Sequence, residues 1–133
     1  MNWRLTLLLA PFVMTSAILL HAGKKPEFAP LASCYDGPLE HDAKDRVPPR
    51  ILHSVDPDYT DEARAEHIQG VVVVQIVLTP EGKVCPEKIV KGLTADLDRN
   101  AVMALSKWTF KPAEKDGKSV ASRINVEVVF RLY

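Results

Sequence analysis

The sequence predicts an α+β fold, a small two-layer sandwich in which two helices pack on one face of a three-stranded antiparallel sheet. Three stretches carry this prediction. Residues 71–79 (VVVVQIVLT) are β-branched on both sides, as in a central strand. Residues 97–113 (LDRNAVMALSKWTFKPA) begin with apolar residues at helical spacing and end with a period of two. Residues 121–132 alternate along their length, as in a further strand.

Length and charge bound the class of protein. A chain of 133 residues has room for one domain and short extensions. Its content of 47% hydrophobic and 26% charged residues is ordinary for a globular chain. Seventeen basic residues balance 17 acidic ones, so no charge excess indicates a nucleic acid as partner. We therefore expect one domain that binds no nucleic acid.

Residues 1–23 are typical of a targeting segment. Residues 5–20 (LTLLLAPFVMTSAILL) contain no charge, and Lys24 and Lys25 end the apolar region. This length suits a secretory signal peptide, whereas extending the run to residue 22 makes a short membrane anchor. The sequence predicts export to the periplasm, with two outcomes left open. The chain is soluble after signal cleavage, or residues 5–22 anchor it in the inner membrane.

Residues 24–49 are predicted to form a linker, because they hold five prolines and little periodicity. The linker contains Cys34, and Cys85 is its one candidate partner in the chain. An exported chain meets oxidising conditions, which favour disulfide formation. Two outcomes stay open at this point: a disulfide that ties the linker to the domain, or two unpaired thiols.

The folded domain is predicted to span residues 50–133. Residues 50–55 (RILHSV) are compatible with a short strand, and a turn-forming cluster follows them. Thr60 is a good N-cap for a two-turn helix, with acidic residues in its first turn. Gly70 fits the left-handed position that ends such a helix. The domain is thus expected to begin with a short strand and a short helix.

Residues 80–83 (PEGK) predict a hairpin turn that joins the central strand to a second strand at residues 84–91. Pro86 favours an edge position for the second strand, because proline donates no backbone hydrogen bond. On the central strand, the face that carries Gln75 and Thr79 is the one expected to meet solvent.

The second helix is expected to cover the sheet. One helical face collects the apolar side chains Leu97, Ala101, Ala104, Leu105 and Trp108. Trp108 and Phe110 then alternate with polar residues, and Pro112 prevents a return to helix. We interpret the two aromatic residues as core packing, and they require no cofactor.

A search for catalytic and metal-binding motifs is negative. The histidines have no zinc-ligand spacing with one another or with the cysteines: His21, His41, His53 and His67. The acidic residues between positions 56 and 62 suit a turn and a helix start, where carboxylates cap amides, better than a paired acid–base site. No serine has a nucleophile-elbow context, and Gly82 and Gly117 are isolated in turns. We therefore expect that the chain is not an enzyme and that it binds no metal and no cofactor.

An ordered set of motifs over residues 48–133 resembles the C-terminal domain of TonB-type energy transducers. In chain order, the matching residues are Pro57-x-Tyr59-x-x-x-Ala63-Arg64, Gly70-Val71-Val72-Val73, Gly82-Lys83-Val84, Leu97-Asp98-x-x-Ala101-x-x-Ala104-x-x-x-Trp108-x-Phe110-x-Pro112-Ala113, Gly117-Lys118-x-Val120 and the strand of residues 126–130. The resemblance implies a periplasmic domain that binds the TonB-box segment of outer-membrane TonB-dependent receptors. It also implies coupling to inner-membrane proton-channel proteins of the ExbB/ExbD type, for uptake of siderophore-iron, cobalamin or similar nutrients.

Two features depart from this family pattern. The 26-residue linker is short, and even a fully extended polyproline form reaches only about 80 Å. The anchor of full transducers carries the pattern Ser-x-x-x-His, in which the two residues are four positions apart. In this chain, Ser16 and His21 are five positions apart. The alternative function is therefore an exported protein- or peptidoglycan-binding envelope module that transduces no energy.

The last strand supplies a mechanism for partner binding. If the sheet order is second–first–third, residues 121–132 form an edge with unpaired amides and carbonyls. An extended receptor segment would add to this edge as another strand. The side chains expected to flank it are Arg123, Asn125, Glu127, Val129 and Arg131. The alternatives are that the linker covers the edge, or that a second copy covers it in a homodimer.

Overall fold

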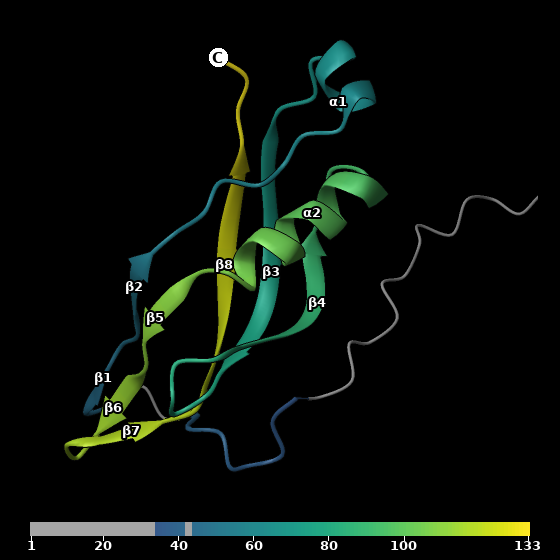
Figure 1. Cartoon of the computed structure of the whole chain (residues 1–133). Coiled ribbons are helices and arrows are strands. Elements are labelled where there is room, and N and C mark those ends of the chain that lie inside the picture. Colours follow the sequence, from purple (N-terminus) through teal and green to yellow (C-terminus); the bar gives the residue numbers. More distant parts are fainter. Residues whose placement is uncertain (1–33, 42–43) are drawn as a thin grey trace, which may run out of the picture.

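The computed structural model describes residues 34–41 and 44–133 (Figure 1). The predicted targeting segment, residues 1–23, and linker residues 24–33 and 42–43 lie outside the described residues. Within the described ranges, no helix combines the length and the apolar content that a membrane crossing requires. The choice between a cleaved signal and an anchor therefore stays a prediction.

The main sheet has three antiparallel strands in the order β4-β3-β8. β3 (Gly70–Leu78) is central, with β4 (Val84–Lys91) on one side and β8 (Ser122–Phe130) on the other. The β3–β8 register runs without a shift through all nine residues of β8. This order is the second–first–third arrangement on which the edge hypothesis depends. The predicted α+β class is confirmed.

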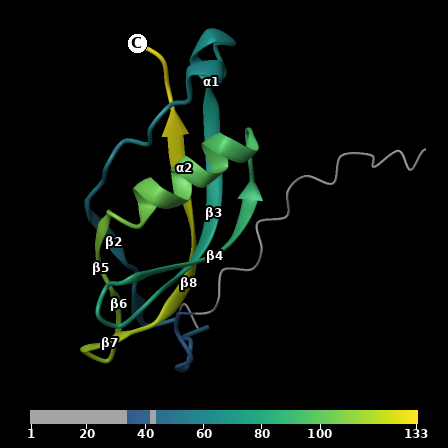
Figure 2. The same cartoon turned by 45° about the vertical axis from the view of Figure 1, so that its right-hand side comes forward.

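Both helices begin at a threonine cap. Thr60 Oγ1 accepts a hydrogen bond from the N–H of Ala63 at the start of α1 (Asp61–Ala65), at 3.1 Å. Thr94 caps α2 (Ala95–Leu105) in the same way. Figures 1 and 2 show α2 lying across one face of the main sheet, with α1 near the start of β3. The opposite face of the sheet carries no helix in the described part of the chain.

The core lies between α2 and the main sheet. Even-numbered residues of β3 and β8 and the apolar face of α2 are buried there: Val72, Val74, Ile76, Leu78, Val126, Val128, Phe130, Leu97, Ala101 and Leu105. Tyr59 packs against this core, with its ring edge-on to Phe130 at 5.4 Å between centroids. Phe110 is buried, and the indole N–H of Trp108 donates to the carbonyl of Val55 at 2.8 Å. The aromatic residues therefore pack as core, as predicted.

Both helices end earlier than the sequence predicted. α1 ends at Ala65 because His67, rather than Gly70, takes the left-handed conformation, with φ 52°. Gly70 instead starts β3, where a Cβ atom would lie 2.8 Å from Leu93 Cδ2. α2 ends at Leu105, so Trp108 follows in a turn and does not extend the helical face.

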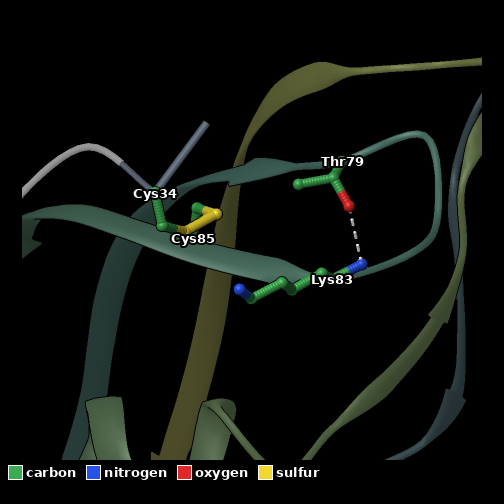
Figure 3. The surroundings of a disulfide bond; sticks show 4 residues. All are labelled: Cys34, Thr79, Lys83 and Cys85. Atoms are coloured by element: carbon green, nitrogen blue, oxygen red, sulfur yellow. Dashed lines mark hydrogen bonds between the residues drawn. A yellow bond between two sulfur atoms is a disulfide. The ribbon is translucent and has the colours of Figure 1, made fainter. Parts of the chain in front are cut away.

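One prediction about solvent exposure is wrong. Thr79, placed on the solvent-facing side of the central strand, is only 4% exposed. Its hydroxyl accepts a hydrogen bond from the N–H of Lys83 at 3.0 Å, which helps to close the β3–β4 hairpin (Figure 3). Gln75, on the same face of β3, is half-buried. This face is thus partly covered in spite of having no helix.

Two small sheets extend the fold beyond the prediction. β2 (Arg50–His53) pairs with β5 (Thr109–Lys111), so the strand expected at residues 50–55 exists but lies outside the main sheet. β1 (Arg46–Val47), β6 (Ala113–Lys115) and β7 (Lys118–Val120) form the other sheet. β1 precedes the predicted domain start at residue 50, because backbone pairing with β6 draws part of the predicted linker into the fold.

Candidate functional site

The main sheet has two edges, and the outer edge of β8 is the candidate site. The direction of its backbone groups follows from the β3–β4 hairpin. The N–H of Thr79 donates to the carbonyl of Lys83 at 2.9 Å, on the β4 side. Backbone groups alternate in direction along a strand. The backbone N–H and C=O groups of odd-numbered residues of β3 therefore point toward β4. Those of even-numbered residues point toward β8.

The same alternation assigns the backbone groups of β8. Because even-numbered residues of β3 pair with even-numbered residues of β8, the odd-numbered residues of β8 point their N–H and C=O groups away from the sheet. A second observation agrees: the carbonyl of Ala121 accepts from the N–H of Glu40 at 2.9 Å, on the side away from β3. Within β8, the outward positions are four of those singled out from the sequence: Arg123, Asn125, Glu127 and Val129. Arg131, the fifth, follows the end of the strand.

These five side chains are exposed and lie on the helix-free face of the sheet. Val129 is 45% exposed, although its neighbours Val128 and Phe130 are buried in the core. The side chains of Asn125, Glu127 and Arg131 have no hydrogen-bond or ion-pair partner within the described part of the chain. An added strand would thus meet a row of unpaired backbone groups flanked by mostly unpartnered side chains.

Arg123 differs from the other four. Its guanidinium makes a bidentate pair with Glu87 of β4, at 2.7 and 2.9 Å, across the central strand. Hydrogen bonding from Arg123 holds the pKa of Glu87 below its ordinary value, with a smaller opposing effect from burial. The same pair raises the pKa of Arg123. This side chain therefore links the two edges of the sheet instead of pointing only toward a partner.

The β4 edge is irregular where the β8 edge is regular. Its register against β3 shifts twice, between Val73 and Val74 and between Gln75 and Ile76. Pro86 is paired with Ile76, whose backbone groups point toward β8, so the proline nitrogen faces away from the sheet. Because proline has no backbone N–H, the outer edge of β4 lacks one hydrogen-bond donor at this position, while the hydrogen bonds between β4 and β3 are unaffected. Irregular register and proline are both devices that discourage strand addition.

The N-terminal described segment, residues 34–41, runs from β4 to the start of β8, and we call it the strap. A disulfide joins Cys34 to Cys85 of β4, with 5.7 Å between the Cα atoms (Figure 3). At its other end, Leu39 forms an isolated parallel bridge with Ala121, next to the start of β8. The strap therefore reaches from the β4 side of the sheet to the beginning of the β8 edge.

Other candidate chemistry stays dispersed. Asp61 and Glu62 occupy the first turn of α1, where they complement the helix dipole. In residues 34–41 and 44–133, no three His, Cys, Asp or Glu side chains gather in a way that could hold a metal ion. The sequence interpretation missed Glu87 as the partner of Arg123. Their separation of 36 positions leaves no local signal, and only the strand order brings them together.

Comparisons with known proteins identify the family and the fold of the domain. A family model described as the Gram-negative bacterial TonB protein C-terminal matches residues 55–132. Protein TonB of Vibrio cholerae serotype O1 is 33% identical over 86 residues, which cover 64% of this chain. The match spans 35% of that protein's length. The solution NMR structure of the Pseudomonas aeruginosa TonB CTD has a TM-score of 0.51 and 26% identity, covering 69% of this chain and 91% of that one.

Proposed function

This chain belongs to the family of Gram-negative bacterial TonB C-terminal domains, and from this we propose that its domain binds the TonB-box segment of outer-membrane receptors by strand addition. The receptor segment pairs with the outer edge of β8, in the periplasm. The proposal extends to energy-dependent uptake of siderophore-iron, cobalamin or similar nutrients. It also includes coupling to inner-membrane proton-channel proteins of the ExbB/ExbD type, through an anchor within residues 1–23.

The regular, outward-facing backbone of β8 is the observation that supports this proposal best. From Arg123 to Val129, each alternate residue offers one donor and one acceptor to an added strand. Each such hydrogen bond contributes about 0.5–1.5 kcal/mol net, and several in a row support a small, reversible interface. Hydrogen bonds between main chains form whatever the side chains of the added strand are. This tolerance suits a domain that binds several receptors.

A proline at the middle of the outward row tests the proposal. Glu127→Pro removes an outward N–H while leaving the β3 ladder intact, because residue 127 does not bond to β3. We expect the affinity for a synthetic TonB-box peptide, measured by isothermal titration calorimetry, to fall about tenfold or more. The matched variant Glu127→Ala keeps the N–H and should bind within a factor of about three. Normal binding by a folded Glu127→Pro protein would overturn strand addition at this edge.

One observation favours the alternative of an envelope module without energy transduction. The strap (residues 34–41) and β1 (residues 46–47) are both attached to the domain. Of the predicted linker, residues 24–49, only residues 24–33 therefore precede the strap as a spacer. Ten residues span at most about 35 Å. N-terminal sequencing and intact mass of protein from membrane and periplasmic fractions separate the two functions. A retained segment 1–23 in the inner membrane supports transduction, and a soluble chain starting near residue 24 supports the alternative.

A further inference from the structure

A polar cavity of about 340 Å³ lies on the helix-free face, between the strap and the beginning of β8. The strap contributes Glu40 and His41, and β1 contributes Arg46. The main sheet contributes residues that sit side by side in the β3–β8 register, with Gln75 directly opposite Asn125. The cavity therefore opens beside the outward-facing row of β8.

Among the residues that the structure describes, one basic side chain bordering the cavity pairs with no carboxylate. Glu40 accepts from Lys115 Nζ at 3.0 Å, and both carboxylate oxygens of Glu87 are held by Arg123. Each of these two carboxylates is thus paired with a basic side chain. The half-buried guanidinium of Arg46 donates to the backbone carbonyl of Glu40 at 3.3 Å and pairs with no carboxylate in the described part of the chain. A guanidinium without a carboxylate partner retains donors that can bind a carboxylate.

Neutral hydrogen-bond donors complete the lining. The side-chain amides of Gln75 and Asn125 have no hydrogen-bond partner among the residues that the structure describes, and both border the cavity. In an added strand, the residue opposite Asn125 places its side chain on the same helix-free face, with its Cβ about 5 Å from that of Asn125. A short acidic side chain at that position reaches the cavity mouth.

We propose that this cavity is a subsite for the carboxylate of an Asp or Glu side chain carried by the added strand opposite Asn125, with Arg46 as the specificity-determining residue. The proposal rests on strand addition at β8. It adds a side-chain preference to a contact otherwise made by main-chain groups. It also fixes the position of the acidic residue relative to β8, and hence the register of the partner segment.

A peptide scan tests the proposal with the full chain under non-reducing conditions. The probes are pairs of peptides based on the TonB-box peptide used above. In each pair, one position is replaced by Asp in one peptide and by Asn in the other, and the pairs cover every position in turn. With the wild-type chain, we expect one position where Asp binds about threefold to fivefold more tightly than Asn. Arg46→Gln should remove this preference, and Arg46→Lys should retain part of it.

Arg99→Gln is the control, because it removes one exposed positive charge from α2, away from the helix-free face. It should leave the preference unchanged. Peptides that bind without an Asp preference at any position would overturn the subsite while leaving strand addition intact. The same holds for a preference that survives in a folded Arg46→Gln protein. Failure of every peptide to bind the wild-type chain would overturn strand addition, and the subsite with it.

Discussion

The two edges of the main sheet are built in opposite ways. β4 has two register shifts, a proline whose nitrogen faces outward, and a disulfide to the strap. β8 runs for nine residues in unbroken register, without proline, and its outward backbone groups beyond Ala121 have no strand beside them in the described part of the chain. Exposed edges are normally blunted because they promote aggregation. A domain that protects one edge and leaves the other regular has an edge available for a partner.

The largest expected effect on stability comes from comparing two kinds of backbone group in β8, those that bond to β3 and those that point outward. Val126→Pro removes an N–H that bonds to β3, and it should lower the free energy of unfolding by about 3 kcal/mol or more. Glu127→Pro changes an outward group and should cost far less. Urea denaturation followed by circular dichroism compares the two. Equal destabilisation would mean that the outward row has been assigned to the wrong residues.

The disulfide tests how β4 is protected. It closes a loop with a sequence separation of 51, so replacing both cysteines with serine should lower the free energy of unfolding by about 2–4 kcal/mol. Reducing agent should lower the stability of the wild-type chain by a similar amount and should not affect the double variant. An unchanged midpoint in urea on reduction would show that the strap does not stabilise the domain through Cys34.

A smaller effect, of opposite sign, concerns the start of β8. The hydroxyl of Ser122 is fully buried and has no hydrogen-bond partner within the described residues. Ser122→Ala removes this unsatisfied group and should raise the free energy of unfolding by about 1 kcal/mol. Thermal denaturation would detect the change. A loss of stability would indicate that the hydroxyl is satisfied in solution, for instance by a bound water.

The smallest effect concerns the Glu87–Arg123 pair, which joins the two edges. The pKa of Glu87 is lower in the folded chain than its ordinary value of 4.5. The pair therefore stabilises the fold above that value, and the contribution is lost as the pH falls through the lower, folded pKa. Glu87→Gln should show a weaker loss of stability between pH 5 and pH 3 than the wild-type chain, roughly in the range where carboxylates titrate. Identical pH profiles would show that the pair contributes nothing measurable, as many exposed pairs do.

The pattern of side-chain faces was predictable from the sequence. A strand has a period of two, so the burial of Val126, Val128 and Phe130 and the exposure of Arg123 and Glu127 follow from local alternation alone. The Thr60 cap and the β3–β4 hairpin likewise depend on a few neighbouring residues. The helix ends were less predictable, because a left-handed His67 competes with a glycine three positions later.

By itself, the sequence determined the α+β class, the alternation of faces along β8, and the family of the domain, because these depend on short-range periodicity and ordered motifs. The tertiary structure alone decided that β8 lies at an edge, that Glu87 meets Arg123, and that the strap reaches Ala121. It also decided that Arg46 lines a cavity beside Asn125. The physical reason is that strand order and chain crossings bring together residues that are 36 to 82 positions apart. No local pattern records which neighbours the folded chain will supply.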